Sequence, residues 1–212
     1  VTFAASSGCT MASQRELFFR HVGQTSPSPM AVEIALAHGV YLVTTEGRKL
    51  IDFISGIAVS NLGHGHPAVV QAVTQQASQH MHLMVYGELV QSPQVEYAQF
   101  LAAHLPSSLN NVYFTNSGTE ATEGAMKLAK RITGRPEMVA FADSYHGSTQ
   151  GALSVMGDEY WRNAFRPLLP GTTQLNYNSF DDLQYITEQT ACVVAETIQA
   201  EAGVLVPQND WL

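Results

Sequence analysis

The stretch Val112-Tyr113-Phe114-Thr115-Asn116-Ser117-Gly118-Thr119 decides the fold class of this chain. Its first four residues favour a buried strand, and the polar turn after them predicts a helix from Glu120 to about Thr133, closed by Gly134. The pattern repeats downstream, with strands expected at 138–141 and 191–197 and a helix around 181–189. Short apolar strands that alternate with helices predict an α/β fold, with a mainly parallel sheet and helices on both faces.

The turn at Ser117, Gly118 and Thr119 has the features of a phosphate-binding site. A helix start offers unpaired backbone N–H groups and the positive end of the helix dipole, glycine permits close approach of a ligand, and two hydroxyls add donors. An ordinary helix cap formed by Ser117 or Thr119 explains the same residues. Neither a P-loop motif nor a G-x-G-x-x-G motif occurs in the sequence, so these two routes to nucleotide binding are not supported.

Two further segments follow predicted strands. Tyr145 stands where ligands of open α/β sheets bind and is suited to cover a flat heterocycle, although an aromatic residue at such a position, taken alone, more often packs than binds a ligand. Glu196 lies near the end of the strand expected at 191–197 and Glu201 follows it, and two acids at this edge would hold a protonated group unless they are solvated loop carboxylates. The three segments therefore share one expected edge of the sheet.

The sequence before this region predicts an extension, a hairpin and two helices. Residues 1–10 are expected to be an unstructured upstream extension, and residues 11–60 an amino-terminal arm with a hairpin at 41–54. Pro67 is placed to open one helix, and Ser92 to open another that ends near residue 104. We expect residues 61–212 to be the first part of a larger, truncated domain.

Composition narrows the range of functions. The 212 residues are 45% hydrophobic and only 13% charged, against roughly 25% in an average domain, which favours an oligomer. A formal charge of −8 argues against nucleic-acid and membrane-surface partners.

No apolar run approaches the ~20 residues of a membrane-spanning helix, and we expect a cytoplasmic protein. Only Cys9 and Cys192 are present, and the pair His64 and His66 fits a tight turn better than a metal site, so no metal is expected.

With these segments in place, the chain from about Phe18 to Leu212 resembles the amino-terminal half of a class III aminotransferase. This family comprises pyridoxal-phosphate enzymes of fold type I, in the ornithine, acetylornithine and 4-aminobutyrate group. The resemblance rests on the order and spacing of landmark segments at residues 47–53, 55–67, 116–121, 145–147 and 198–203. It implies an incomplete large domain that binds pyridoxal 5'-phosphate, preceded by an amino-terminal segment of the small domain.

The resemblance also implies roles for individual residues. Ser117, Gly118 and Thr119 would hold the cofactor phosphate, Tyr145 would lie against the pyridine ring, and His146 would lie beside it. Glu196 matches an acid near the hydroxyl edge of the ring. Glu201 matches a substrate-binding glutamate that pairs with a mobile arginine. Two positions depart from the family pattern: Thr25 stands where relatives often have a substrate-contacting tyrosine, and Thr197 replaces a proline.

The implied reaction is transamination of an ω-amino compound with 2-oxoglutarate as acceptor, in a homodimer whose partners are small amines and keto acids. No catalytic residue is expected in this chain: the Schiff-base lysine, the aspartate that pairs with the pyridine nitrogen and the switch arginine are expected beyond Leu212. Lys49 lies in the hairpin, and at ~100° per residue Lys127 and Lys130 are predicted to face away from the core. The 212-residue chain is therefore expected to be inactive alone.

Three alternatives compete with this interpretation. An aminomutase of the same family would move nitrogen within one substrate and need no acceptor. A non-catalytic module would bind pyridoxal phosphate or dimerise without turnover. An α/β domain in which the turn only caps a helix would bind no cofactor.

Overall fold

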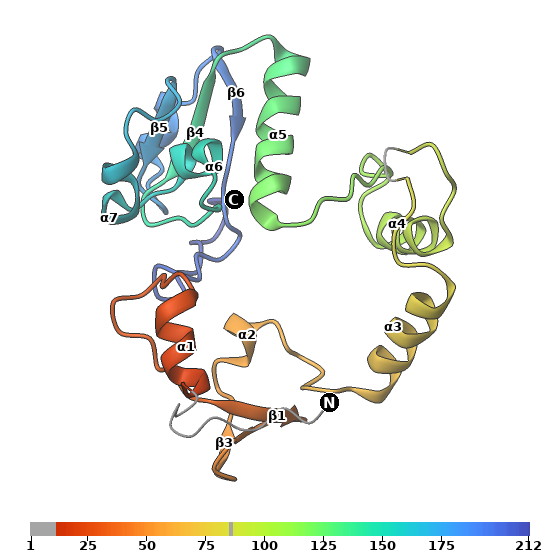
Figure 1. Ribbon diagram of the computed structural model, residues 1–212. Coiled ribbons are helices and arrows are strands. Elements are labelled where there is room, and N and C mark those ends of the chain that lie inside the picture. Colours follow the sequence, from red (N-terminus) through yellow and green to blue (C-terminus); the bar gives the residue numbers. More distant parts are fainter. Residues whose placement is uncertain (1–11, 85–86) are drawn as a thin grey trace, which may run out of the picture. The chain divides into compact units, whose positions relative to one another are not determined.

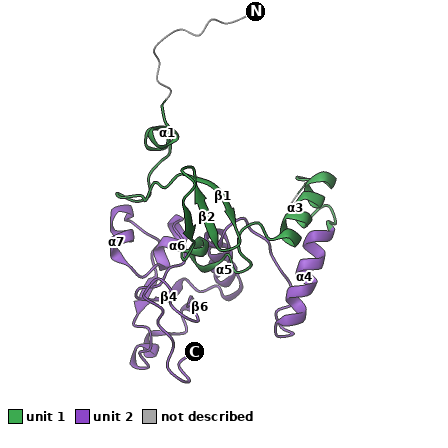
Figure 2. Ribbon diagram, turned by 90° about the horizontal axis from the view of Figure 1, so that it is seen from below, with its two compact units in different colours: residues 1–91 green, residues 92–212 purple. Residues whose placement is uncertain are grey.

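A computed structural model describes residues 12–84 and 87–212 (Figure 1). The chain forms two compact units, residues 1–91 and 92–212, which we describe separately (Figure 2). The extension expected at residues 1–10 lies outside the described residues. The expected domains at 11–60 and 61–212 remain a prediction. In the described ranges, no helix combines the length and apolar character that crossing a bilayer requires.

The first unit is built around an antiparallel sheet in the order β1-β2-β3. The hairpin expected at 41–54 is present as β2 and β3, with Tyr41 paired to Ile51 and Gly47 turning the chain at a φ of +81°. Pro67 opens a helix as predicted. The elements are α1 (Gln14–His21), β1 (Ile34–His38), β2 (Tyr41–Thr44), β3 (Lys49–Ile51), α2 (Ser55–Ala58) and α3 (Pro67–Gln79).

The short α2 is a left-handed turn. Ser55, Ile57 and Ala58 have φ values of +51°, +64° and +60°, and Gly56 between them has +64°. The Asp52 carboxylate accepts the Ser55 N–H at 2.8 Å and lies 2.7 Å from His64 Nε2. His64 in turn exchanges two backbone hydrogen bonds with Gly39, of 2.7 and 2.9 Å. The turn expected around His64 is therefore present, and it ties the segment after β3 to the sheet.

The second unit contains a parallel sheet in the order β5-β4-β6. The helix predicted to begin at Ser92 does so. The helix that follows the turn at Ser117, Gly118 and Thr119 ends before Gly134, as predicted. The elements are α4 (Ser92–His104), α5 (Gly118–Thr133), β4 (Glu137–Phe141), α6 (Gln150–Val155), α7 (Glu159–Arg162), η1 (Asn163–Phe165), β5 (Thr172–Leu175), η2 (Asp181–Tyr185) and β6 (Thr190–Val193).

The core of this unit lies on both faces of β4. Met138 and Ala140 pack with Met126 of α5 and Val155 of α6 on one face. Val139 and Phe141 pack with Leu175 and Trp211 on the other. The mainly parallel α/β arrangement is confirmed. Within the described residues, α5 and α6 share one face, while the end of the chain at Trp211 covers the opposite one.

Three local expectations were wrong. Residues 112–115 form no strand, because no neighbouring strand among the described residues completes a hydrogen-bonded ladder with them. The helix expected at 181–189 is a 3₁₀ turn of five residues, and the strand expected at 191–197 ends at Val193.

The buried face of α5 was also predicted incorrectly. At ~100° per residue, Leu128 and Ile132 lie opposite Lys127 and Lys130 and were expected to face the core, but they are 57% and 73% exposed, whereas Met126 is 3% exposed. Lys130, expected to face away from the core, is half-buried on the side of Met126. The reason is that α6 and β6 pack against the face of α5 that contains Thr119, Met126 and Lys130. On that face, Thr119 and Glu123 form hydrogen bonds with Thr149.

Candidate functional site

The site begins at the amino-terminal end of α5. Ser117 caps the helix, and its Oγ accepts the Glu120 N–H at 3.3 Å. The Glu120 carboxylate accepts the Asn116 N–H at 2.8 Å and the Ser117 hydroxyl at 3.2 Å, so an anionic oxygen is already stabilised at this turn. The N–H groups of Gly118 and Thr119 have no acceptor among the described residues. The cap expected from the sequence is thus present, and the phosphate-binding role of this turn remains a prediction.

The loop after β4 is fixed beside this helix start. Gly147 has a φ of +122°, and a Cβ added there would collide with the Thr119 side chain and lie 2.9 Å from its Cα. The hydroxyl groups of Thr119 and Thr149 form a hydrogen bond of 2.7 Å, and the Thr149 N–H donates to Thr119 Oγ1 at 3.2 Å. By contrast, a Cβ at Gly118 would meet nothing within 4 Å, which leaves open space at the turn.

Glu196 is brought to the same loop. Its carboxylate accepts the Tyr145 N–H at 3.1 Å. Tyr177 donates its hydroxyl to the backbone oxygens of Glu196 and Thr197, both at 3.2 Å, which fixes the chain after β6. The Tyr145 ring is partly exposed, and its hydroxyl lies 3.3 Å from Ser148 Oγ. Glu196 and Tyr145 are thus held together through the backbone of the loop.

His146 occupies a more enclosed position. Burial lowers the pKa of its imidazole below 6.5, and the nearby Glu196 carboxylate partly opposes this shift. Its Nε2 is buried and has no hydrogen-bond partner among the described residues. An unpaired buried nitrogen of this kind is free to bond to a ligand.

Glu201 lies at a cavity of about 450 Å³ that it shares with Tyr145. Asp143, Asp158 and Trp161 line the same cavity. The structure therefore connects Ser117–Thr119 to the Tyr145–Thr149 loop, joins that loop to Glu196, and places Glu201 beside Tyr145. All seven residues singled out from the sequence belong to one compact unit.

Sequence reasoning missed Glu123 and Thr149. One Glu123 carboxylate oxygen accepts the Thr149 hydroxyl at 2.6 Å and the N–H groups of Gly151 and Ala152 at 2.9 and 3.2 Å. The spacing of four residues between Thr119 and Glu123 places them on one face of α5 and was the available signal.

Gln199 was missed as well: it is buried, donates to Ala142 O at 2.9 Å, and leaves its Oε1 without a partner among the described residues.

None of the three lysines of this chain lies at the start of α5: two lie further along this helix, and the third belongs to the first unit. Lys127 and Lys130 are ~12 and ~16 Å along α5 from Thr119 at 1.5 Å per residue. Lys49 in the first unit places its Nζ 3.7 Å from the centre of the Tyr41 ring. The expectation that none of them forms a Schiff base remains a prediction.

Comparisons with known proteins place the chain in a family. Residues 22–212 match the class III aminotransferases. Acetylornithine aminotransferase of Methanopyrus kandleri is 40% identical over 93% of this chain and 50% of its own length. The corresponding protein of Bacillus subtilis is 41% identical over 85% of this chain and 46% of its own length. The chain therefore spans about half the length of these curated relatives.

Solved structures agree with this assignment. Taurine:2-oxoglutarate aminotransferase of Bifidobacterium kashiwanohense, crystallised with PLP and glutamate, aligns with a TM-score of 0.79 and 28% identity, over 92% of this chain and 50% of that one. A transaminase of the marine bacterium Virgibacillus aligns with a TM-score of 0.83 and 25% identity, over 93% and 50%. The fold expected from the sequence, that of fold type I enzymes, is confirmed.

Proposed function

Because this chain belongs to the class III aminotransferase family, we propose that the protein catalyses transamination of an ω-amino compound, with 2-oxoglutarate as the acceptor. Pyridoxal 5'-phosphate is the cofactor of this reaction. The observation that carries the proposal is the linked set of residues at one end of α5. Thr119 bonds to Thr149, and Tyr145 of the same loop bonds to Glu196.

The residues of this chain fit the cofactor. The free N–H groups of Gly118 and Thr119, with the Ser117 hydroxyl, would hold its phosphate at the positive end of the helix dipole. Tyr145 would cover the ring, with His146 beside it and Glu196 near its hydroxyl edge. When bound, the cofactor supplies the electron sink for moving an amino group. The contribution of these residues is to hold the phosphate and the ring in fixed positions.

His146 would meet the cofactor as a neutral imidazole. Burial holds its pKa below 6.5, so the ring is uncharged at neutral pH and can donate or accept one hydrogen bond. Its unpartnered Nε2 is available for that bond. A neutral ring beside the pyridine also avoids adding a positive charge close to a protonated pyridine nitrogen.

The substrate class rests on the relatives and on the cavity at Glu201. Three of the relatives bear the names acetylornithine aminotransferase, taurine:2-oxoglutarate aminotransferase and [LysW]-aminoadipate semialdehyde/glutamate semialdehyde transaminase. We propose an amine donor of this ω-amino type, such as acetylornithine, ornithine or 4-aminobutyrate. Glu201 would contact the substrate and pair with an arginine when no α-carboxylate is bound. The carboxylates of Asp143 and Asp158 in the same cavity favour a protonated group over an anion there.

We also propose that the protein is a cytoplasmic homodimer. The supporting observation is the exposure of apolar side chains on α3, where Val69, Val70 and Val73 are all solvent-exposed on a helix without a charged residue. A second copy of the chain would bury such a face.

The direct test is an assay of the protein expressed from its complete reading frame. It is incubated with pyridoxal phosphate and each candidate amine, with and without 2-oxoglutarate, and the glutamate formed is measured. We expect glutamate only when an amine and the acceptor are both present. Rearranged product without the acceptor would identify an aminomutase, and cofactor binding without turnover would identify a binding module.

A matched pair of variants tests the site itself. Thr119→Val removes the hydroxyl beside the proposed phosphate position, whereas Thr133→Val removes a hydroxyl at the far end of the same helix, bonded to Ala129 O at 2.8 Å. We expect the first to raise the Kd for the cofactor about tenfold and the second to leave it unchanged. Equal effects of the two variants would contradict the proposed phosphate site.

A further inference from the structure

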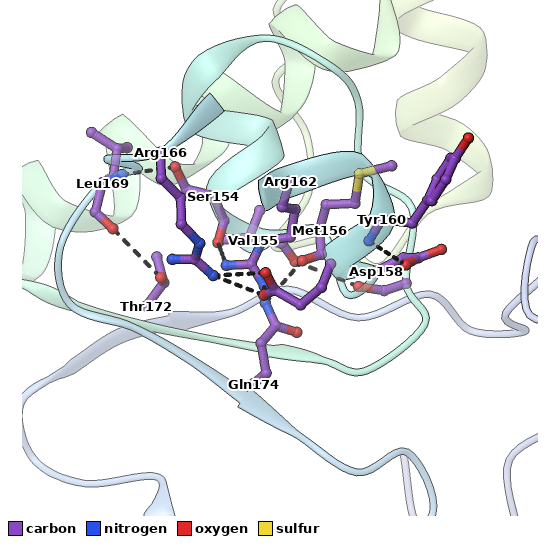
Figure 3. A network of polar contacts seen from close by, with 12 residues as sticks. Ser154, Val155, Met156, Asp158, Tyr160, Arg162, Arg166, Leu169, Thr172 and Gln174 are labelled. Atoms are coloured by element: carbon purple, nitrogen blue, oxygen red, sulfur yellow. Dashed lines mark hydrogen bonds and ion pairs between the residues drawn. The ribbon is translucent and has the colours of Figure 1, made fainter. Parts of the chain in front are cut away.

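A second polar network in the same unit surrounds Arg162, the last residue of α7 (Figure 3). Arg162 is only 5% exposed. Its Nη2 donates to Ser154 O at 3.2 Å, and its Nη1 lies 3.1 Å from Glu159 Oε1. Its Nε is buried and has no partner among the described residues. A buried guanidinium N–H without an acceptor is costly, so its presence indicates an acceptor that binds there.

Arg166 brings a second guanidinium to this network. Its Nη2 lies 2.9 and 2.8 Å from the two oxygens of Glu159, which is therefore shared by both arginines. Two guanidinium groups thus converge on a single carboxylate, in a chain whose formal charge is −8.

Arg162 and Arg166 both line an open cavity of about 520 Å³, a volume that suits a small molecule. Residues 167–172 form the rest of its lining, and this segment contains two prolines and two leucines. No acidic side chain is among the described residues that line the cavity. The cavity thus combines arginine donors with apolar walls.

We propose that this cavity binds a small oxyanion, a carboxylate or a phosphate, through Arg162 and Arg166. The planar guanidinium fork matches the geometry of both oxyanions, and charge-assisted hydrogen bonds of this type are among the strongest in proteins. Leu168 and Leu169 would pack against an aliphatic part of an organic anion. The site is separate from the Ser117–Thr119 turn, and the proposal does not depend on the proposed aminotransferase function.

A competing explanation is a buried water molecule. Gln174 of β5 donates to Met156 O at 3.2 Å, and its buried Oε1 has no partner among the described residues. A water molecule that bridged Arg162 Nε to this oxygen would satisfy both groups. In that case the Arg162 N–H would not respond to added anions.

The test is a titration of the ¹⁵N-labelled 212-residue chain, followed through the Nε–H signals of its arginine side chains. The probes are inorganic phosphate and succinate, added separately at constant ionic strength and pH. Arg162→Lys and Arg166→Lys assign the two signals. Because each signal reports its own site, phosphate that binds at the start of α5 does not interfere. Arg135 is the control, since it pairs with Glu188 at 3.2 Å on the surface.

We expect the Arg162 and Arg166 signals to shift with one common Kd, while the Arg135 signal stays in place. A response to phosphate alone or to succinate alone supports the proposal and identifies the anion. Glu159→Gln removes the competing carboxylate and is expected to lower that Kd about tenfold. A merely structural role for Glu159 would not produce tighter binding.

Two results would overturn the proposal. One is the absence of any shift at Arg162 and Arg166 up to the solubility limit of both probes. The other is a shift of Arg135 in parallel with them, which would show general ionic association. Glu159 and Arg166 are about half exposed, so variants at these positions still test the proposal if Arg162→Lys fails to fold.

Discussion

At the scale of single residues, Gly147 is the position where the proposed site depends most on the absence of a side chain. Its φ of +122° disfavours any other residue, and a Cβ would collide with Thr119. We expect Gly147→Ala to lower the free energy of unfolding by about 1–3 kcal/mol. Urea unfolding followed by tryptophan fluorescence measures this. Gly203→Ala is the matched control, because Gly203 has a φ of +93° but open space around its Cβ. An equal loss in both variants would show that contact with Thr119 contributes nothing.

His146 gives a pH dependence at the same scale. Burial lowers its folded-state pKa below 6.5, so between that lowered value and 6.5 the unfolded chain binds a proton that the folded chain does not. Stability contributed by the neutral imidazole is therefore lost as the pH falls below 6.5. We expect His146→Gln to flatten the decline in the free energy of unfolding in this window. The exposed His104→Gln is the control, and an unchanged slope in His146→Gln would contradict the assignment.

At the scale of elements, α5 and α6 are joined by Glu123. Its carboxylate accepts the N–H groups of Gly151 and Ala152 at the start of α6, so it caps a helix to which it does not belong. We expect Glu123→Gln to lower the free energy of unfolding by about 1–3 kcal/mol, since a charge-assisted bond becomes a neutral one. Glu188→Gln, a surface control, should leave it nearly unchanged. Indistinguishable midpoints and slopes in urea would show that the cap is unimportant.

The left-handed turn α2 supports a prediction in the first unit. Ile57 is 75% exposed at a φ of +64°, so its side chain offsets little of the backbone strain. We expect Ile57→Gly to stabilise the turn by about 1 kcal/mol. The exchange rates of the Val59 and Ser60 amides, both bonded to Ser55 O, report this directly. Val59→Gly is the matched control, because Val59 is also exposed but has a φ of −112°. Slower exchange in the control than in Ile57→Gly would contradict the strain argument.

The success of sequence reasoning differs between elements for physical reasons. Ser117, Gly134 and Pro67 act through local geometry, and the helix ends that they predict are present. A strand at 112–115 would need a neighbouring strand from a distant part of the chain, and no pattern within eight residues shows whether such a neighbour is present. The buried face of α5 was predicted incorrectly for a similar reason: Thr119 and Glu123 bond to Thr149, a residue 26 positions or more along the chain that the sequence pattern of the helix does not reveal.

At the scale of the whole molecule, one unit contains all the site residues that were predicted from the sequence. Their proximity in space followed from a general rule, that the carboxyl ends of parallel strands share one edge of a sheet. Thr149 and Gln199 could not be found in this way, because their roles depend on contacts between distant segments. The parallel sheet and the family were predictable, whereas the hydrogen bonds that fix the site were not.

The most direct measurement is the binding of pyridoxamine 5'-phosphate to this chain, followed by its ³¹P signal. This probe has no aldehyde, so it cannot react with surface lysines. The Arg162→Lys variant is titrated in parallel, so that phosphate bound at the arginine cavity is distinguished from phosphate bound at the turn. We expect saturable binding that Gly118→Ala weakens about tenfold, because its Cβ would enter the open space at the turn. Gly124→Ala, in the same helix and equally free of close contacts, should bind as the wild type does. Absent binding, or equal weakening by both variants, would contradict the proposal that this turn holds the cofactor phosphate.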